Sequence, residues 1–224
     1  MFQYATTFAA SKRANQQCAF PENEPNLFEL FTLSSEKIDR PQGFSIYKEP
    51  HFHYEPLPEI EQSTTLHGYF QSEKYFADYA DEVKAEFVLR TPKYPEELDQ
   101  EYIALHVRRG DYLNHPDTHP TCSVEYYTAA LEMLPDKPVK IFTDDYDWCS
   151  KTFKGNRFSI SNENFINDFE LMTKCHYHII ANSSFSWWAA WLSDSKKVIA
   201  PKKWFGPKAP GSSKDIIPDT WTTI

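Results

Sequence analysis

The stretch 102–112, which reads Y-I-A-L-H-V-R-R-G-D-Y, ends an apolar run in a cluster of charged side chains. Its first six residues have the length and the β-prone composition of a strand buried on both faces. Arg108, Arg109 and Asp111 follow this strand directly. A guanidinium stays charged and presents a planar set of donors that matches the oxygens of a phosphate, so these residues could hold a phosphorylated ligand. A charge cluster that only caps the strand is the alternative.

The two arginines are adjacent, and this predicts different roles for them. Successive side chains of an extended chain point to opposite sides, so we expect only one arginine to meet the ligand directly. The other is expected to pair with Asp111 or to brace the loop. Gly110 permits a tight turn there, which a residue with a Cβ atom would resist.

Short polar side chains also follow two later apolar runs, at 139–145 (V-K-I-F-T-D-D) and at 178–184 (H-I-I-A-N-S-S). The paired carboxylates of Asp144 and Asp145 could hold a metal ion, accept hydrogen bonds from a ribose or an amine, or cap the next helix. The sequence leaves these roles open. Hydroxyl residues at the start of a helix leave backbone N–H groups free, which favours a phosphate near Ser183.

Strands and helices alternate through the second half of the chain, and this alternation positions the polar clusters. Strands are expected at 102–107, 139–143, 178–181 and 197–200, with helical patterns between most of them. Such an order predicts an α/β domain with a parallel sheet, and ligands of these sheets sit outside the carboxyl ends of the strands. The residue patterns therefore predict a nucleotide-like, phosphate-containing ligand at one sheet edge, but they do not predict a reaction.

Composition excludes several classes of protein. The chain has 224 residues, with 23 basic and 32 acidic residues and a net charge of −9, which argues against a general nucleic-acid binder. No uninterrupted apolar run approaches the roughly 18 residues that span a membrane. The four cysteines are far apart and form no C-x-x-C pair, so neither structural zinc nor a disulfide framework is expected.

The first part of the chain shows weaker patterns. A helix is expected over 1–18, and a polar, proline-containing break at 91–99 places a domain boundary between 98 and 99. His51 and His53 alternate on one extended face and could form a metal pair. Since no third ligand is evident nearby, a half-exposed strand is the preferred interpretation. Further along, Asn167 and Glu170 have the spacing of a capping box at the start of a helix.

Four ordered motifs resemble the α-1,2-fucosyltransferase family, glycosyltransferase family 11. They are L-H-G-Y-F-Q-S-E-K-Y-F at 66–76, H-V-R-R-G-D-Y at 106–112, I-F-T-D-D at 141–145, and N-D-F-E-L-M through I-I-A-N-S-S-F-S-W-W-A-A-W-L at 167–192. The resemblance covers nearly the whole chain. It implies a GT-B-like α/β fold with two Rossmann-like lobes. The amino-terminal, acceptor-side lobe would be 1–98, and the GDP-sugar-binding lobe, with a complete parallel sheet, would be 99–224.

The resemblance also implies an activity. A galactoside α-1,2-fucosyltransferase, of the hexosyltransferase class, moves fucose from GDP-fucose to the 2-hydroxyl of a terminal galactose in a glycan, with inversion and without a required metal or other cofactor. GDP-fucose and a galactose-terminated glycan are then the expected partners. The alternatives are a transferase that uses another GDP-sugar and a non-catalytic remnant that binds a nucleotide or a glycan. The expected location is cytoplasmic or peripheral to a membrane in a bacterium, and the Golgi in a eukaryote if an anchor has been lost.

Residue roles are implied by the same motifs. Arg108 would hold the diphosphate and stabilise the leaving GDP. His106 and Asp168 would contact the guanosine part, and Asp111 and Asp145 are the candidates for a general base. The donor pocket is expected to comprise His106, Arg108, Arg109, Thr143, Asp144, Asp168, Asn182, Ser183, Ser184 and Phe185.

One departure from the family pattern concerns the first residues. Family members usually carry a glycine-rich strand and turn, G-x-G-N-Q, directly before M-F-Q-Y-A, whereas M-F-Q-Y-A opens this chain. The first strand of the amino-terminal lobe is therefore expected to be missing, and that lobe is expected to be truncated.

Overall fold

The computed structural model of the protein describes residues 1–21, 27–39, 43–209 and 211–224. The chain forms two compact units. The first comprises Met1–Thr91 and Gly211–Pro218, and the second comprises Pro92–Pro210 and Asp219–Ile224. The division after Thr91 lies seven residues before the boundary expected at 98/99, and the return of 211–218 to the first unit has no counterpart in the sequence pattern.

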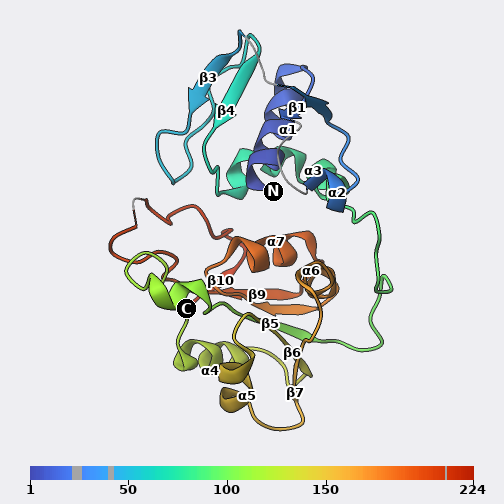
Figure 1. Ribbon diagram of the computed structural model, residues 1–224, viewed down its shortest axis with the longest axis vertical. Coiled ribbons are helices and arrows are strands. Elements are labelled where there is room, and N and C mark those ends of the chain that lie inside the picture. The colour runs from blue at the N-terminus through green and yellow to red at the C-terminus, as the bar shows by residue number, and fades with distance from the viewer. Residues whose placement is uncertain (22–26, 40–42, 210) are drawn as a thin grey trace. The chain divides into compact units, whose positions relative to one another are not determined.

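A parallel six-stranded sheet forms the centre of the second unit (Figure 1). Its strands are β5 (Ile103–Val107), β6 (Val139–Thr143), β7 (Phe158–Ile160), β8 (Tyr177–Ile179), β9 (Lys197–Ala200) and β10 (Thr222–Thr223). This sheet confirms the expected α/β class. Strands β7 and β10 were not predicted, because strands of three and two residues are too short to show an apolar run.

Helices cover both faces of this sheet. They are α4 (Val124–Glu132), α5 (Tyr146–Thr152), α6 (Phe165–Thr173) and α7 (Ser184–Leu192), with a short 3-10 turn at Asp111–Asn114. Helices α6 and α7 lie on one face, and α4 and α5 lie on the other (Figure 1). Each α-helix begins at a side chain that accepts a hydrogen bond from a backbone N–H of its first turn; these caps are Ser123, Asp145, Asn164 and Ser183.

The strand order locates the edge at which a ligand can bind. The order across the sheet is β10-β9-β8-β5-β6-β7. Strands β6 and β7 are added on one side of β5, and β8, β9 and β10 are then added on its other side. The order reverses between β5 and β8, which pair in register at Leu105 and Ile179. In open parallel sheets, ligands bind at the carboxyl ends of the strands beside such a reversal.

The core of the second unit is rich in β-branched and aromatic side chains. Every residue of β5 is buried, and Ile103, Leu105 and Val107 pack in one cluster with Tyr127 and Ile141. On α7, residues 187, 188 and 191 are buried tryptophans whose rings pack against one another. They are core residues.

The first unit is built from short elements. They are α1 (Phe2–Ala14), α2 (Leu27–Leu30) and α3 (Ala80–Glu86), 3-10 turns at Glu73–Tyr75 and Ala77–Tyr79, and two parallel strand pairs, β1 (Ala19–Pro21) with β2 (Glu36–Ile38) and β3 (Ser45–Lys48) with β4 (Thr64–His67). Helix α1 ends four residues before the expected end at 18, because Asn15 adopts a left-handed conformation with a φ of 51°.

The segment between β3 and β4 differs from the expectation. The half-exposed strand predicted for His51 and His53 is wrong, since residues 49–63 form irregular chain. Prolines at positions 50, 56 and 58 lack a backbone N–H, which disfavours strand pairing in this segment. Among the described residues, no helix combines the length and the apolar character needed to cross a membrane.

Candidate active site

Arg108 leaves the carboxyl end of β5 and is held by two carboxylates. Its Nη2 donates to Asp111 Oδ1 at 2.7 Å, and its Nη1 lies 3.0 Å from Asp144 Oδ2. The guanidinium also lies 5.4 Å from the centre of the Tyr112 ring. The side chain nevertheless stays 36% exposed, so this cation faces accessible space.

Arg109 makes a different set of contacts. Its Nε donates to Asp145 Oδ2 at 2.9 Å, and its guanidinium lies 4.3 Å from the centre of the Trp148 ring on α5. Its backbone N–H donates to Asp144 Oδ1 at 2.8 Å. With only 17% of its side chain exposed, Arg109 fixes the loop against α5.

Asp145 is the N-cap of α5. One carboxylate oxygen accepts the backbone N–H of Trp148 at 3.1 Å, and the other accepts from Arg109. The hydrogen bond from Arg109 lowers the pKa of Asp145, which weakens this carboxylate as a base. Thr143 takes part in the same turn, because its hydroxyl accepts the backbone N–H of Asp145 at 2.9 Å. Of the roles that the sequence left open, these contacts support capping and arginine pairing.

Gly110 permits this arrangement through close approach. A Cβ atom at this position would lie 2.6 Å from Asp144 Oδ2, so any larger residue would push this carboxylate away from the loop. Asp111 is the more accessible carboxylate, with 62% of its side chain exposed. Asp111 is therefore the freer of the two candidates for a general base.

The residues after β8 divide into buried and accessible groups. Asn182 is buried, and its Nδ2 donates to the carbonyl oxygens of Pro120 and Trp204, each at 2.9 Å. Its amide therefore braces neighbouring loops and does not face a ligand. Ser183 caps α7 by accepting the backbone N–H of Phe185 at 3.4 Å, while Ser184 is exposed in the first turn of this helix.

Tyr112 connects the loop after β5 with the loop after β8. Its hydroxyl donates to the backbone carbonyl of Asn182 at 3.1 Å, and its ring lies beside the Arg108 guanidinium. No role was predicted for Tyr112 from the sequence. Only its position directly after the charged cluster indicates that it belongs to the site.

His106 is buried on β5 beside the start of α7. The centre of its ring lies 5.5 Å from that of Phe185, which in turn packs against Phe169 of α6. Burial, with a smaller effect from the charge on Arg108, lowers the pKa of His106 to about 3, so the imidazole is neutral at physiological pH. Its Nδ1 is buried and has no hydrogen-bond partner in the described protein, which leaves one polar atom available for a ligand.

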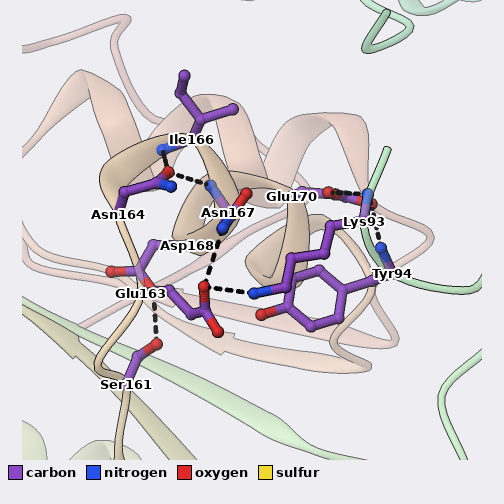
Figure 2. A network of polar contacts seen from close by, with 9 residues as sticks. All are labelled: Lys93, Tyr94, Ser161, Glu163, Asn164, Ile166, Asn167, Asp168 and Glu170. Carbon is purple, nitrogen blue, oxygen red and sulfur yellow. Dashed lines mark hydrogen bonds and ion pairs between the residues drawn. The ribbon is translucent and has the colours of Figure 1, made fainter. Parts of the chain in front are cut away.

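Asp168 lies on α6 within a polar network (Figure 2). Its Oδ1 accepts the Ser161 hydroxyl at 2.5 Å, and burial raises the pKa of its carboxyl group. In the same network, Glu163 accepts hydrogen bonds from the Lys93 ammonium and the Asn167 amide. The Asp168 carboxylate is thus partly buried and already holds one donor.

The same network shows that the expected capping box is wrong. Asn164 caps α6, since its Oδ1 accepts the backbone N–H groups of Ile166 and Asn167 at 3.0 Å each (Figure 2). Glu170 is buried and accepts the backbone N–H groups of Lys93 and Tyr94, each at 2.8 Å. It therefore ties the start of the second unit to α6.

The structure thus brings Arg108, Arg109, Asp111, Asp144 and Asp145 into one hydrogen-bonded cluster. Tyr112 connects this cluster with the start of α7.

Comparison with known proteins identifies a family and several relatives. The family model described as "Glycosyl transferase family 11" matches residues 42–224. An alpha-1,2-colitosyltransferase from Escherichia coli is 30% identical over 97% of this chain and 79% of its own length. The O-antigen biosynthesis glycosyltransferase WbnK from Escherichia coli is 35% identical over 54% of this chain, and galactoside alpha-(1,2)-fucosyltransferase 1 from Aotus azarae is 25% identical over 73%. These alignments cover 44% and 50% of the latter two proteins. No solved structure matches the chain significantly.

Proposed function

The chain belongs to glycosyltransferase family 11, and on this premise we propose that it transfers fucose from GDP-fucose to the 2-hydroxyl of a terminal galactose in a glycan, with inversion and without a metal. The position of Arg108 is the main support for this proposal. Its accessible guanidinium stands at the carboxyl end of β5, beside the reversal of the strand order. A dianionic diphosphate has a natural site at this edge of the sheet.

Arg108 supplies the positive charge that the reaction needs. As the bond between the sugar and GDP breaks, negative charge develops on the departing phosphate, and a preorganised donor at that point stabilises the transition state. Arg108 is preorganised because Asp144 and the Tyr112 ring hold its guanidinium in place. The diphosphate takes the place of the exposed Asp111 carboxylate on Nη2.

The start of α7 completes the phosphate site in this proposal. Backbone N–H groups in the first turn of a helix, together with its dipole, favour an anion. Ser184 is exposed there and adds a hydroxyl donor. Tyr112 keeps this turn connected with the Arg108 loop.

His106 and Asp168 recognise the guanosine part. A carboxylate that accepts two N–H groups is the natural partner of the guanine edge, and Asp168 provides one on α6. His106 stays neutral, and its unpartnered Nδ1 can exchange a hydrogen bond with the nucleoside. Arg109, Thr143, Asp144 and Asn182 act behind this surface as supports.

Asp111 serves as the general base once the diphosphate has released it from Arg108. It accepts the proton of the galactose 2-hydroxyl while that oxygen attacks the anomeric carbon from the side opposite GDP. The anomeric configuration inverts, and GDP leaves with the bonding electron pair. We assign the GDP-sugar to a Rossmann-like lobe at 99–224 and the acceptor to the lobe at 1–98, as in a GT-B fold.

A second donor deserves a direct comparison because a relative that is aligned over 97% of this chain is a colitosyltransferase. Colitose lacks the 3-hydroxyl group that fucose carries. A pocket that hydrogen-bonds this hydroxyl rejects the deoxy sugar strongly, whereas an apolar pocket tolerates either. Initial rates with GDP-fucose and GDP-colitose at equal concentration decide between these donors.

The test of the proposal combines calorimetry with GDP and a transfer assay on a galactose-terminated oligosaccharide. We expect Arg108→Ala to lower transfer about 100-fold or more, in line with the loss of one preorganised donor, and to weaken GDP binding. Lys203→Ala removes an exposed cation from the same unit and serves as the control. Unchanged turnover in Arg108→Ala would refute the assignment. GDP binding without any transfer would identify a non-catalytic remnant, and no GDP binding would refute both functions.

A further inference from the structure

The irregular segment between β3 and β4 presents three metal-ligating side chains in the pattern H-x-H-x-E. These are His51, His53 and Glu55. The segment bends at residues 52 and 53 and brings the ligand atoms of all three side chains within 4.8 Å of one another.

Aromatic packing holds the two residues that alternate with these ligands, Phe52 and Tyr54. The Phe52 ring stacks on Tyr69, with ring centres 5.2 Å apart, and the Tyr54 ring packs edge-on against Tyr75 at 4.9 Å. These two contacts hold the intervening residues against the first unit. His51 and Glu55 remain accessible, with side chains 55% and 43% exposed.

Hydrogen bonds fix the backbone at the same point. The N–H of Tyr54 donates to Asp215 Oδ2 at 3.1 Å, and the N–H of Glu55 donates to the Tyr75 hydroxyl at 3.3 Å. Asp215 is held in turn by Lys74 at 2.6 Å. The three outward side chains therefore project from a backbone that is already ordered.

The ligand atoms converge on one point. His51 Nε2 and His53 Nε2 lie 3.5 Å and 3.7 Å from the same Glu55 oxygen, Oε1. Zinc bonds of about 2.0–2.1 Å at tetrahedral angles place two ligand atoms about 3.4 Å apart. The observed separations are close to this edge length, and all three ligand atoms lie within 4.8 Å of one another.

The two imidazole rings lie beside each other, so both can offer a nitrogen atom to one ion. The two imidazole rings are stacked at 4.8 Å with an interplanar angle of 7°. A neutral imidazole offers a nitrogen lone pair, and a metal ion accommodates two such lone pairs and a carboxylate together.

We propose that His51, His53 and Glu55 bind a divalent transition-metal ion of the zinc class. Two imidazole nitrogens and one carboxylate oxygen suit zinc better than magnesium or calcium, which prefer oxygen ligands alone. Three protein ligands leave a fourth position for water. All three ligands belong to the first unit, whereas the residues assigned to the donor belong to the second, so this inference does not depend on the proposed transfer.

The test is titration of the metal-free protein with zinc chloride by calorimetry, and with cobalt(II) as a spectroscopic probe. We expect saturable binding of one equivalent and visible cobalt absorption typical of four-coordinate geometry. His51→Ala, His53→Ala and Glu55→Gln should each weaken zinc binding about tenfold or more, because each removes one ligand. His67→Ala removes another exposed histidine of the first unit and should leave the affinity unchanged.

Three results would overturn the inference. They are the absence of saturable zinc binding, binding that persists unchanged in His51→Ala and Glu55→Gln, and an equal loss of binding in His67→Ala. Circular dichroism and thermal unfolding of each metal-free variant confirm that the comparison is made between folded proteins.

Discussion

Arg108 and Arg109 are adjacent in the sequence but differ in what they can do. Arg109 is held between Asp145 and the Trp148 ring, and most of its side chain is covered. Arg108 pairs with the exposed Asp111 carboxylate, and its own side chain remains 36% exposed. The alternation of side chains along an extended chain predicts this division. The residue pattern alone left open which arginine would be the accessible one, because that depends on where α5 begins, and only the family resemblance pointed to Arg108.

A comparison of the two candidate bases tests the residue assignments. Asp111→Asn removes a base and also a competitor for Arg108, so we expect kcat to fall about 100-fold or more while GDP binds at least as tightly as before. Asp145→Asn keeps an oxygen that can cap α5 and removes the charge that pairs with Arg109, so we expect a loss of stability within about 1 kcal/mol and a much smaller fall in kcat. Steady-state kinetics, calorimetry with GDP and urea unfolding measure these effects. Equal losses of kcat in the two variants would contradict the assignment of the base.

At the scale of elements, the long strands and most helices follow from the sequence. Strand β5 was recognisable because it is a continuous apolar run that ends in charge. Helix α5 was not, because its seven residues, Tyr146–Thr152, bury only Cys149 and so show no helical period. The start of α6 was misassigned because Asn164 and Asn167 are both preferred cap residues close to the apolar positions of this helix, and only the backbone conformation of Asn164 makes it the cap.

The cap of α6 can be tested with a pair of matched variants. Asn164→Ala leaves two backbone N–H groups without their side-chain acceptor, so we expect a loss of about 1 kcal/mol in the free energy of unfolding. Asn167→Ala removes one exposed hydrogen bond to Glu163, so we expect a change within about 0.5 kcal/mol. Urea unfolding of both variants provides the measurement. A larger loss in Asn167→Ala would restore the capping box that the sequence suggested.

The contacts of Glu170 on α6 allow a second prediction about stability. Its buried carboxylate accepts two backbone N–H groups at the start of the second unit, and an amide in its place presents an N–H₂ group toward one of them. We expect Glu170→Gln to lower the free energy of unfolding by about 1–3 kcal/mol, since a buried donor loses its acceptor. Hydrogen exchange at Lys93 and Tyr94 should accelerate in this variant. Unchanged exchange at both amides would show that Glu170 does not hold this segment.

At the scale of the whole molecule, the sequence motifs identified the family, but they did not reveal how the chain divides. Residues 211–218 return to the first unit because Asp215 pairs with Lys74 and accepts the Tyr54 N–H. Local sequence patterns do not predict contacts between positions so far apart in the chain. The H-x-H-x-E spacing is visible in the sequence, where only the two histidines were considered as metal ligands. The packing of Phe52 and Tyr54 holds the segment in which Glu55 lies beside the two histidines.

Two buried histidines predict how the stability of the molecule depends on pH. Burial lowers the pKa of His106 to about 3 and that of His178 to about 4. His178 is fully covered, and its ring nitrogens lie 2.8 Å from the Met172 carbonyl oxygen and 2.9 Å from the Ser195 hydroxyl. In the unfolded chain both pKa values return to about 6.5. As the pH falls below this value, the unfolded state takes up protons that the folded state does not, so stability is lost on acidification.

The pH range of this loss of stability distinguishes the contribution of the histidines from that of the carboxylates. Well below pH 6.5, each buried histidine removes about 1.4 kcal/mol of stability per pH unit, whereas carboxylates with lowered pKa values contribute only at more acidic pH. Urea unfolding between pH 7 and pH 5 therefore reports mainly on His106 and His178. We expect His178→Asn to reduce the pH dependence by about one proton. A flat stability profile in the wild-type protein would mean that these histidines are protonated while folded, and a neutral His106 could then no longer be part of the guanosine site.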